Sequence, residues 1–335
     1  MTPPRERRSR TVAVVAHAMK ADHRLRTQLE RAADKAGYAH FLWLETSEED
    51  AGAGAARDAL EQGVDLVVAA GGDGTLRDVA EAMRGSNVPL GIIPLGTGNL
   101  FAHNLAPRIR SIAPVVLTVP QAIKTAFGGV DREVDLGVIE LQWPDGTRSE
   151  HVFLVLAGIG IDAQMIANTT PEAKRAVGVL AYVGGIVRSL RTGRSIRVHS
   201  VIDDHSPRDG SVHSLLVGNC GMLPGNIPLL PAAELDDGVF DIVTLRPSSF
   251  FGWLNLLRTF FVEFPVLGRS RAGRKIVASD GRHMRNLRYE QGRQVTVALA
   301  EPDDIEIDGE HLGKVIGFVA RVDPGSLVVR VSEAP

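Results

Sequence analysis

The sequence predicts an α/β protein, in which an N-terminal doubly wound parallel sheet is followed by a β-rich sandwich domain. Up to about residue 130, short apolar runs alternate with segments of helical periodicity, which is typical of parallel β-α-β units. From residue 132 onward, segments of strand length follow one another between Pro, Gly and Asp residues, which indicates an antiparallel sandwich or barrel. With 335 residues, 44% of them apolar, the chain has enough material for two buried cores.

The N-terminal part alternates strands and helices along the chain. Its predicted strands cover residues 11–16, 40–44, 64–70 and 88–94. Its predicted helices cover residues 25–36 and 47–62, a segment that begins at Leu76, and residues 100–105 and 111–127. Gly37 fits the position just after the first helix, where a left-handed backbone is common. The order β, α, β, α, β, α, β argues for a doubly wound parallel sheet.

The C-terminal part is predicted to be mainly β-structure. Its predicted strands cover residues 133–142, 151–157, 195–202, 211–219, 238–245, 275–279, 294–298 and 304–307, and two further runs of β pattern cover residues 315–322 and 326–331. Many of these segments are bounded by Pro, Gly or Asp, which favour turns between short strands.

Composition narrows the class of protein. Lysine and arginine number 37 against 40 acidic residues, a net charge of −3, so no nucleic-acid partner is expected. The single cysteine, Cys220, excludes an internal disulfide and suits a reducing cytosol. The basic residues 1–10 predict a solvated arm, with attraction to anionic lipid headgroups or a signal peptide as alternatives. We therefore expect a cytoplasmic protein.

A glycine-rich turn follows the third predicted strand. The apolar run 64–70 ends in Gly71, Gly72, Asp73, Gly74 and Thr75, and a helix pattern begins at once. Glycines let backbone approach a phosphate, and the first turn of a helix offers unpaired N–H groups. An aspartate beside phosphates requires a cation such as Mg²⁺. The turn predicts a site for a metal and a nucleotide, with a plain βα turn as the alternative.

A second turn of this kind follows the fourth predicted strand. The run 88–94 leads into Leu95, Gly96, Thr97, Gly98 and Asn99 before the next helix. The carboxyl ends of parallel strands lie at the same edge of a sheet, where ligands bind. We therefore expect both turns to contribute to one site.

The two turns, GGDGT and then PLGTGN about twenty residues later, resemble the diacylglycerol kinase catalytic-domain family. The chain is similar to its bacterial lipid-kinase branch, which is related to the sphingosine kinases and shares GGDG with NAD kinases and phosphofructokinases. The resemblance implies an ATP-binding domain with a fold like that of NAD kinases and phosphofructokinases at residues 1–130. It also implies a β-rich lipid-substrate domain at 131–312, with the active site in the cleft between the two domains. A C-terminal segment, 313–335, is expected to return towards the first domain.

The resemblance also assigns nucleotide contacts, with one departure. Where the family has an NPxxG-like turn that helps to hold phosphates, this chain has residues 17–22, without that proline and glycine. Lys20 could supply the missing charge, and a surface lysine is the alternative. Thr46 matches a threonine that contacts the nucleotide in relatives, and it could also cap the next helix in a capping box with Glu49.

A metal site and a catalytic turn are implied further along the chain. Asp237 matches the family's aspartate at a second, structural Mg²⁺ site, with Glu234 and Val239 at the flanking positions, although relatives can carry lysine in place of Glu234. The strand that leads into Asp308, Gly309 and Glu310 matches the family's DGE. Its glutamate is assigned as the base that deprotonates the lipid hydroxyl, and Asp308 and Asp73 are the other expected catalytic residues.

Two further segments match the family or suggest a membrane contact. Residues 158–163 (GIGIDA) match a GxGxDA turn, and Lys174, Arg175 and Tyr182 fit positions downstream. The apolar segment 248–268 carries charges that disfavour a membrane span, so it predicts an amphipathic helix that covers the β domain or touches the bilayer.

The predicted function is phosphorylation of a hydroxyl of diacylglycerol or a related lipid, with ATP and Mg²⁺ as cofactors. The expected substrate lies at the bilayer surface, with peripheral association of the enzyme at the inner face of the membrane. The alternatives are a kinase of a soluble alcohol, similar to NAD kinases, and a non-catalytic regulator that binds nucleotide or lipid. The sequence leaves open which lipid is used and whether the protein is a homodimer.

Overall fold

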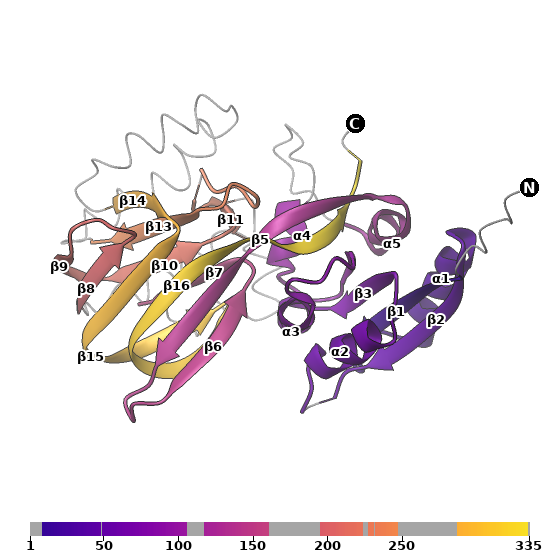
Figure 1. Ribbon diagram of the computed structural model, residues 1–335, viewed down its shortest axis with the longest axis horizontal. Helices are drawn as coiled ribbons and strands as arrows, with labels where there is room; N and C mark the ends of the chain where they lie inside the picture. Colours follow the sequence, from indigo (N-terminus) through magenta and orange to yellow (C-terminus); the bar gives the residue numbers. More distant parts are fainter. Residues whose placement is uncertain are drawn as a thin grey trace, which may run out of the picture. The chain divides into compact units, whose positions relative to one another are not determined.

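The computed structural model describes residues 9–47, 49–105, 117–160, 195–223, 227–230, 232–246 and 287–333. The chain divides into two compact units (Figure 1). Unit 1 comprises Met1–Ile109, Val115–Val134 and Gly325–Pro335, and unit 2 comprises Arg110–Pro114 and Asp135–Pro324.

Unit 1 contains a parallel sheet in the order β4-β3-β1-β2. Its strands are β1 (Arg10–Ala16), β2 (Tyr38–Glu45), β3 (Leu66–Gly71) and β4 (Leu90–Pro94). The last residues of β16 (Glu310–Val331) join this sheet, where Val329 pairs in parallel with Leu90. The middle strand β3 is buried along its whole length, as expected of a parallel strand with helices on both faces.

Helices cover both faces of this sheet. They are α1 (His23–Lys35), α2 (Ala53–Glu61), α3 (Asp73–Met83), α4 (Leu100–Leu105) and α5 (Val119–Gly128). Val12 and Val14 of β1 pack into one core cluster with the buried residues of α1 and α5. Val15, on the opposite face of the same strand, lies beside the N-terminus of α2. The predicted doubly wound α/β fold is therefore confirmed for the N-terminal part.

Helix α2 begins later than predicted, at Ala53 instead of residue 47, and the expected capping box of Thr46 and Glu49 is not formed. The reason is Asp50, whose carboxylate accepts hydrogen bonds from the backbone N–H groups of Gly52, Gly54 and Ala55 at 2.9–3.1 Å. Burial alone would raise the pKa of Asp50, but these backbone donors together hold the pKa below its ordinary value. The carboxylate thus takes the capping role before the helix starts.

Replacing Asp50 with Ala is expected to cost about 1 kcal/mol of stability at neutral pH, because the N–H groups lose their acceptor. A lowered folded-state pKa means that the stabilisation is present above about pH 4 and is lost as the pH falls through the folded pKa. The Tm of the variant is therefore expected to lie below that of the wild type at pH 7 and to approach it near pH 2. An equal difference at both pH values, measured by thermal unfolding, would contradict this role.

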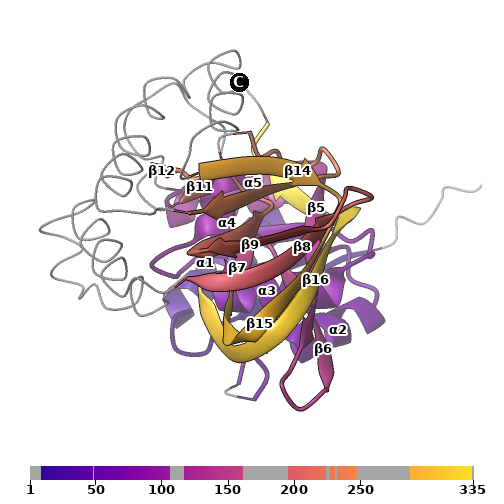
Figure 2. The same ribbon diagram turned by 90° about the vertical axis from the view of Figure 1, so that its left-hand side faces the viewer.

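Unit 2 is a mainly antiparallel β-structure, which confirms the predicted β-rich domain. Its longer strands are β5 (Val130–Gln142), β6 (Arg148–Phe153), β7 (Leu156–Ile159), β8 (Ile196–Ile202), β9 (Arg208–Val212), β10 (Ser214–Gly218), β13 (Phe240–Leu245), β14 (Leu287–Gly292), β15 (Gln294–Ile307) and β16, and a short pair is formed by β11 (Met222–Leu223) and β12 (Ile227–Pro228). The order β14-β13-β10-β7-β15-β16 forms the main path, with β8 beside β15 (Figure 1). The long strands β15 and β16 lie side by side (Figure 2).

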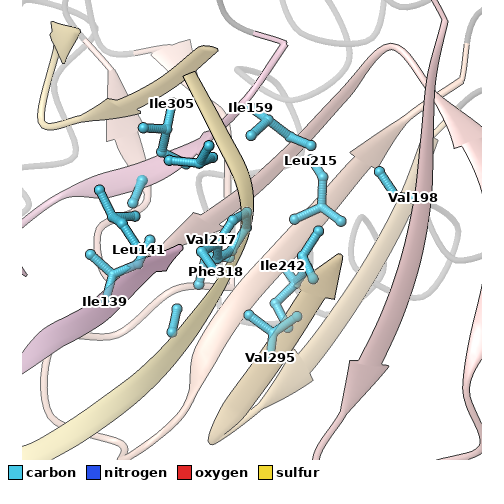
Figure 3. Packing of buried hydrophobic residues seen from close by; sticks show 14 of the residues in the cluster. Ile139, Leu141, Ile159, Val198, Leu215, Val217, Ile242, Val295, Ile305 and Phe318 are labelled. Carbon is cyan, nitrogen blue, oxygen red and sulfur yellow. The ribbon is translucent and has the colours of Figure 1, made fainter. Parts of the chain in front are cut away.

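The core of unit 2 is formed by side chains from many of these strands (Figure 3). Leu141, Leu215, Val217, Ile242 and Phe318 are all at most 3% exposed. These residues come from segments far apart in the sequence. The core therefore joins strands from the whole unit, and not only the two strands of each hairpin.

The strand boundaries differ from the predictions in two ways. Residues 294–298 and 304–307 belong to one strand, β15, and residues 315–322 and 326–331 belong to one strand, β16. Conversely, residues 151–157 and 211–219 are each divided between two strands. Pro and Asp signals predict turns locally, whereas long-range pairing of β15 with β16 carries the strand through the irregular residues between Ala298 and Asp303. The predicted strand 275–279 and the apolar segment 248–268 lie outside the described residues.

Candidate functional site

The two glycine turns of unit 1 are in direct backbone contact. A Cβ built on Gly96 would lie 2.8 Å from the Cα of Gly72, and the N–H of Leu95 donates to the carbonyl of Gly71 at 2.7 Å. No side chain larger than hydrogen fits between two backbones at this distance. The adjacent ends of β3 and β4 thus form one continuous backbone surface, as expected for ligand binding at the carboxyl edge of a parallel sheet.

Helix α3 begins at this surface, directly after Gly72. The N–H groups of Asp73, Gly74 and Thr75 lie in its first turn, where no preceding helical carbonyl accepts them. Thr75 is 5% exposed, and a Cβ on Gly71 would lie only 2.6 Å from its Cβ. The glycine lets the threonine close the turn. The arrangement presents amide donors and the positive end of a helix dipole to an anion.

Lys20 brings a positive charge to the same place. Its Nζ would lie 3.3 Å from a Cβ on Gly72. The turn that carries it is held by hydrogen bonds from the N–H of Lys20 to the carbonyl of His17 at 2.9 Å and from the N–H of Ala18 to the Oγ1 of Thr46 at 3.4 Å. Within the described part of the chain, no carboxylate forms an ion pair with Lys20. The charge is available for an anionic ligand.

Asp73 connects the two turns. Its Oδ1 accepts the N–H of Leu100, the first residue of α4, at 2.7 Å, and a Cβ on Gly98 would lie 2.8 Å from its Oδ2. Burial raises the pKa of Asp73, and the backbone donors Leu100, Asn99 and Phe101 partly oppose this rise. One carboxylate oxygen therefore has a structural role that the sequence did not predict.

Asn99 closes the second turn upon itself. Its side chain accepts the N–H of Gly96 at 2.9 Å and donates to the carbonyl of Gly96 at 2.7 Å, and its own backbone has φ +47°. The carboxamide thus holds the turn in shape, whereas the neighbouring Thr97 is exposed. Thr97 is the side chain of this turn that is accessible to a ligand.

Replacing Gly96 with Ala is expected to raise the Kd for an anionic nucleotide such as ATP at least about tenfold, roughly 1.4 kcal/mol of binding free energy. The added Cβ would overlap the backbone of Gly72 and the side chain of Asn99, so the two turns must separate. Gly128→Ala is the matched control, because a Cβ at Gly128 meets nothing within 4 Å. Equal Kd values for the two variants would show that the close contact of the turns is not required.

The DGE turn of unit 2 connects β15 to β16. Ile307 pairs with Glu310, and between them Asp308 and Gly309 have φ values of +50° and +86°. Two residues with positive φ form the tight hairpin turn that Asp-Gly sequences favour. Glu310 follows on the exposed side of this turn. The carboxylate of Asp308 is turned back to the backbone of Leu154–Leu156.

The loop that contains Glu234, Asp237 and Val239 is rich in carboxylates. Burial raises the pKa of Asp237, and the negative charges of Asp135, Glu234 and Asp236 raise it further, against a backbone hydrogen bond from Val239. Nearby, burial raises the pKa of Asp241 to about 7. Mutually repelling carboxylates that resist ionisation favour the binding of a cation.

Asp135 is the residue of this region that sequence reasoning missed. It is 3% exposed, its Oδ2 accepts the N–H of Gly238 at 2.7 Å, and its N–H donates to the carbonyl of Leu235 at 2.7 Å. Asp135 therefore holds the acidic loop against β5. The available signal was an aspartate between the apolar residues Val134 and Leu136 in a predicted buried strand.

The donors of this loop fit a hard cation such as Mg²⁺. In the described part of the chain no group of three or more His, Cys, Asp or Glu side chains is arranged to hold a metal. A site of one carboxylate and backbone carbonyls, as implied for Asp237, Glu234 and Val239, needs no such group. The Nδ2 of Asn219 donates to the carbonyl of Asp135 at 2.7 Å, while its buried Oδ1 has no partner among the described residues.

Some predicted positions cannot be placed. Gly158 and Ile159 end strand β7 and Gly160 follows with φ +74°, but residues 161–163 of the GxGxDA match, and with them Lys174, Arg175 and Tyr182, lie outside the described residues. None of the helices that the structure describes is both long and apolar enough to cross a membrane.

Comparison with protein families gives two adjoining matches. The model of the diacylglycerol kinase catalytic domain matches residues 14–139, and the model of the YegS C-terminal NAD kinase beta sandwich-like domain matches residues 155–331. A crystal structure described as that of a diacylglycerol kinase from Bacillus anthracis has a TM-score of 0.64 at 19% identity, and the match covers 97% of this chain and 97% of that one. This similarity shows the fold.

Curated relatives resemble the chain along most of its length. A Pseudomonas syringae pv. tomato protein named "Probable lipid kinase YegS-like" is 32% identical over 286 residues, 82% of this chain and 78% of its own. The diacylglycerol kinase of Bacillus subtilis is 26% identical over 290 residues, 85% and 83% of the two chains. A longer Synechocystis protein, sll0036, is 26% identical, and this chain spans about half of it (52%).

Proposed function

The chain belongs to the diacylglycerol kinase catalytic-domain family and is a lipid kinase, and from that premise we propose that it transfers the γ-phosphoryl group of ATP, with Mg²⁺, to a hydroxyl of diacylglycerol or a related lipid. The observation that carries the proposal is the contact between the two glycine turns at the N-terminus of α3, with the Nζ of Lys20 above Gly72. This combination of backbone donors and one ammonium group suits a polyphosphate.

The residues of unit 1 have separate roles in this proposal. The N–H groups of residues 72–75 and the exposed hydroxyl of Thr97 bind phosphate oxygens, and Lys20 neutralises part of their charge. Thr46 keeps the turn that carries Lys20 in place. Asp73 fixes the second turn with Oδ1. Its Oδ2 would hold Mg²⁺, directly or through water.

The residues of unit 2 act on the acceptor and hold a structural ion. Glu310 accepts the proton of the lipid hydroxyl. Asp237, with backbone carbonyls of Glu234 and Val239, would hold a structural Mg²⁺, and Asp135 fixes the loop. Mg²⁺ bound at the phosphates supplies charge neutralisation during phosphoryl transfer. We propose that the substrate is taken from the inner face of the cytoplasmic membrane by a peripherally bound enzyme.

Incubation of the protein with γ-labelled ATP, Mg²⁺ and mixed micelles of each candidate lipid tests this function. Label is expected in one class of lipid and is expected to disappear when EDTA is added. Label only in a soluble alcohol such as NAD would replace the lipid by a soluble acceptor. No label in any acceptor, although ATP protects the protein from thermal unfolding, would identify a nucleotide-binding protein without kinase activity.

A further inference from the structure

The carboxylate of Asp308 is surrounded by backbone donors from another part of the chain. Its Oδ2 accepts the N–H of Leu154 at 2.7 Å, and its Oδ1 accepts the N–H groups of Val155 and Leu156 at 2.8 and 2.9 Å. The N–H of Asp308 donates in return to the carbonyl of Leu156 at 2.8 Å. Four hydrogen bonds therefore join this one residue to a segment more than 150 residues earlier in the chain.

This arrangement continues the pairing of two strands beyond their regular ends. Ile307, the last residue of β15, pairs with Ala157 of β7, and Asp308 follows with a left-handed backbone. Its carboxylate then accepts hydrogen bonds from N–H groups that the backbone of a further strand residue could not reach. Leu154 and Val155 are at most 3% exposed, so water is no substitute acceptor for their amides.

The hydrogen bonds also bear on the chemistry that Asp308 can perform. A carboxylate has about four lone-pair sites, and three of them are occupied here by N–H donors. Protonation would remove the negative charge that strengthens these hydrogen bonds to buried amides. Glu310, two residues later, is exposed and lies on the same turn.

We propose that Asp308 is a positioning residue for Glu310: its carboxylate clamps the β15–β16 turn to residues 154–156 and so fixes the backbone from which the base projects. An Asp-Gly turn alone does not need this clamp, because Asn-Gly favours the same hairpin geometry. The three amides are what require a carboxylate. The inference rests on the proposed function, since it assumes that Glu310 is the base.

Asp308→Asn tests the clamp without disturbing the turn. Asparagine suits the left-handed conformation, but its NH₂ group must face at least one of the three amide donors. We expect kcat to fall about 10- to 100-fold, with the KM for ATP within about twofold of the wild type. The acidic limb of the pH–kcat profile is expected to remain, because Glu310 is still the base. Hydrogen exchange at the amides of residues 154–156 is expected to become at least about tenfold faster.

Asp203→Asn is the matched control in the same unit. Asp203 has φ +47°, and its Oδ1 accepts the N–H groups of Arg293 and Gln294, each at 2.8 Å. This variant weakens a comparable clamp away from the DGE turn, because a neutral amide oxygen accepts less strongly than a carboxylate oxygen. Its exchange is therefore expected to change near residues 293–294 while kcat stays at the wild-type value. It therefore separates positioning of the base from loss of stability.

Three results would overturn the proposal. An unchanged kcat in Asp308→Asn would remove the positioning role, and loss of the acidic limb would make Asp308 the base instead. An equal fall of kcat in Asp203→Asn would reduce the effect to general destabilisation. If the wild type phosphorylates no lipid, the proposed function fails and the positioning role with it, while the exchange rates still decide whether the clamp exists.

Discussion

Replacing Glu310 with Gln is expected to lower kcat on the order of 10² to 10⁴-fold, about 3 to 5 kcal/mol of transition-state stabilisation, while the KM for ATP stays near its wild-type value. The glutamine keeps the size and exposure of the side chain at the start of β16 but cannot accept the proton of the lipid hydroxyl. The nucleotide contacts assigned to unit 1 involve none of the atoms that this change alters.

Steady-state kinetics with the preferred lipid and a pH–kcat profile measure this effect. A general base produces an acidic limb in the pH–kcat profile, and this limb is expected to be absent in Glu310→Gln. Glu301→Gln is the control, because Glu301 is an exposed glutamate of the same unit, 76% exposed in its side chain. A folded Glu310→Gln enzyme with wild-type kcat would exclude Glu310 as the base.

Replacing Asp73 is expected to have the second large effect, and two variants separate its two roles. Asp73→Ala removes both the acceptor for the N–H of Leu100 and the negative charge, so turnover is expected to be abolished and the second turn to loosen. Asp73→Asn can keep the hydrogen bond through its amide oxygen but loses the charge. Its Tm is expected to lie close to that of the wild type while kcat falls at least about 10²-fold.

Two outcomes of the comparison between the Asp73 variants would change the roles assigned to Asp73. If Asp73→Asn recovers both Tm and kcat, the residue serves only to connect the turns, and its proposed contact with Mg²⁺ is wrong. If Asp73→Ala alone loses ATP-dependent thermal protection, the connection of the turns is what ATP binding requires. Titration of kcat with Mg²⁺ for Asp73→Asn completes the test, because a lost metal contact is expected to raise the concentration needed.

Much of unit 1 could be predicted from local patterns. The buried run in β3, the glycine turn after it and the repeat of this arrangement after β4 are all contiguous in the sequence. Apolar residues with a period of 3.6 indicate the helices, and short continuous apolar runs indicate the fully buried strands. The helix after residue 46 was placed six residues too early, because the pattern does not reveal that Asp50 caps it from outside.

The sequence predicts that unit 2 is β-structure, but it predicts the ends of the individual strands less well. Short segments with turn residues between them predicted β-structure, and β-structure is present. Where one strand ends depends on its partner. Ala298 pairs with Gly317, and Asp303 pairs with Val315, across an irregularity at which the local Pro and Asp signals predict a turn. Asp135 was missed for the same reason, since its partners Leu235 and Gly238 lie about a hundred residues away.

By itself, the sequence determined the fold class and the family, and it predicted which short turns carry the chemistry, because these depend on residue types within a few positions of one another. Only the tertiary structure decided what the individual side chains do within those turns. Asp73 meets Leu100, 27 residues later, and Asp308 meets Val155, 153 residues earlier. The local sequence of a carboxylate beside a glycine is the same whether the carboxylate faces a ligand or a buried amide. Only folding brings the hydrogen-bond partner that distinguishes the two cases near it.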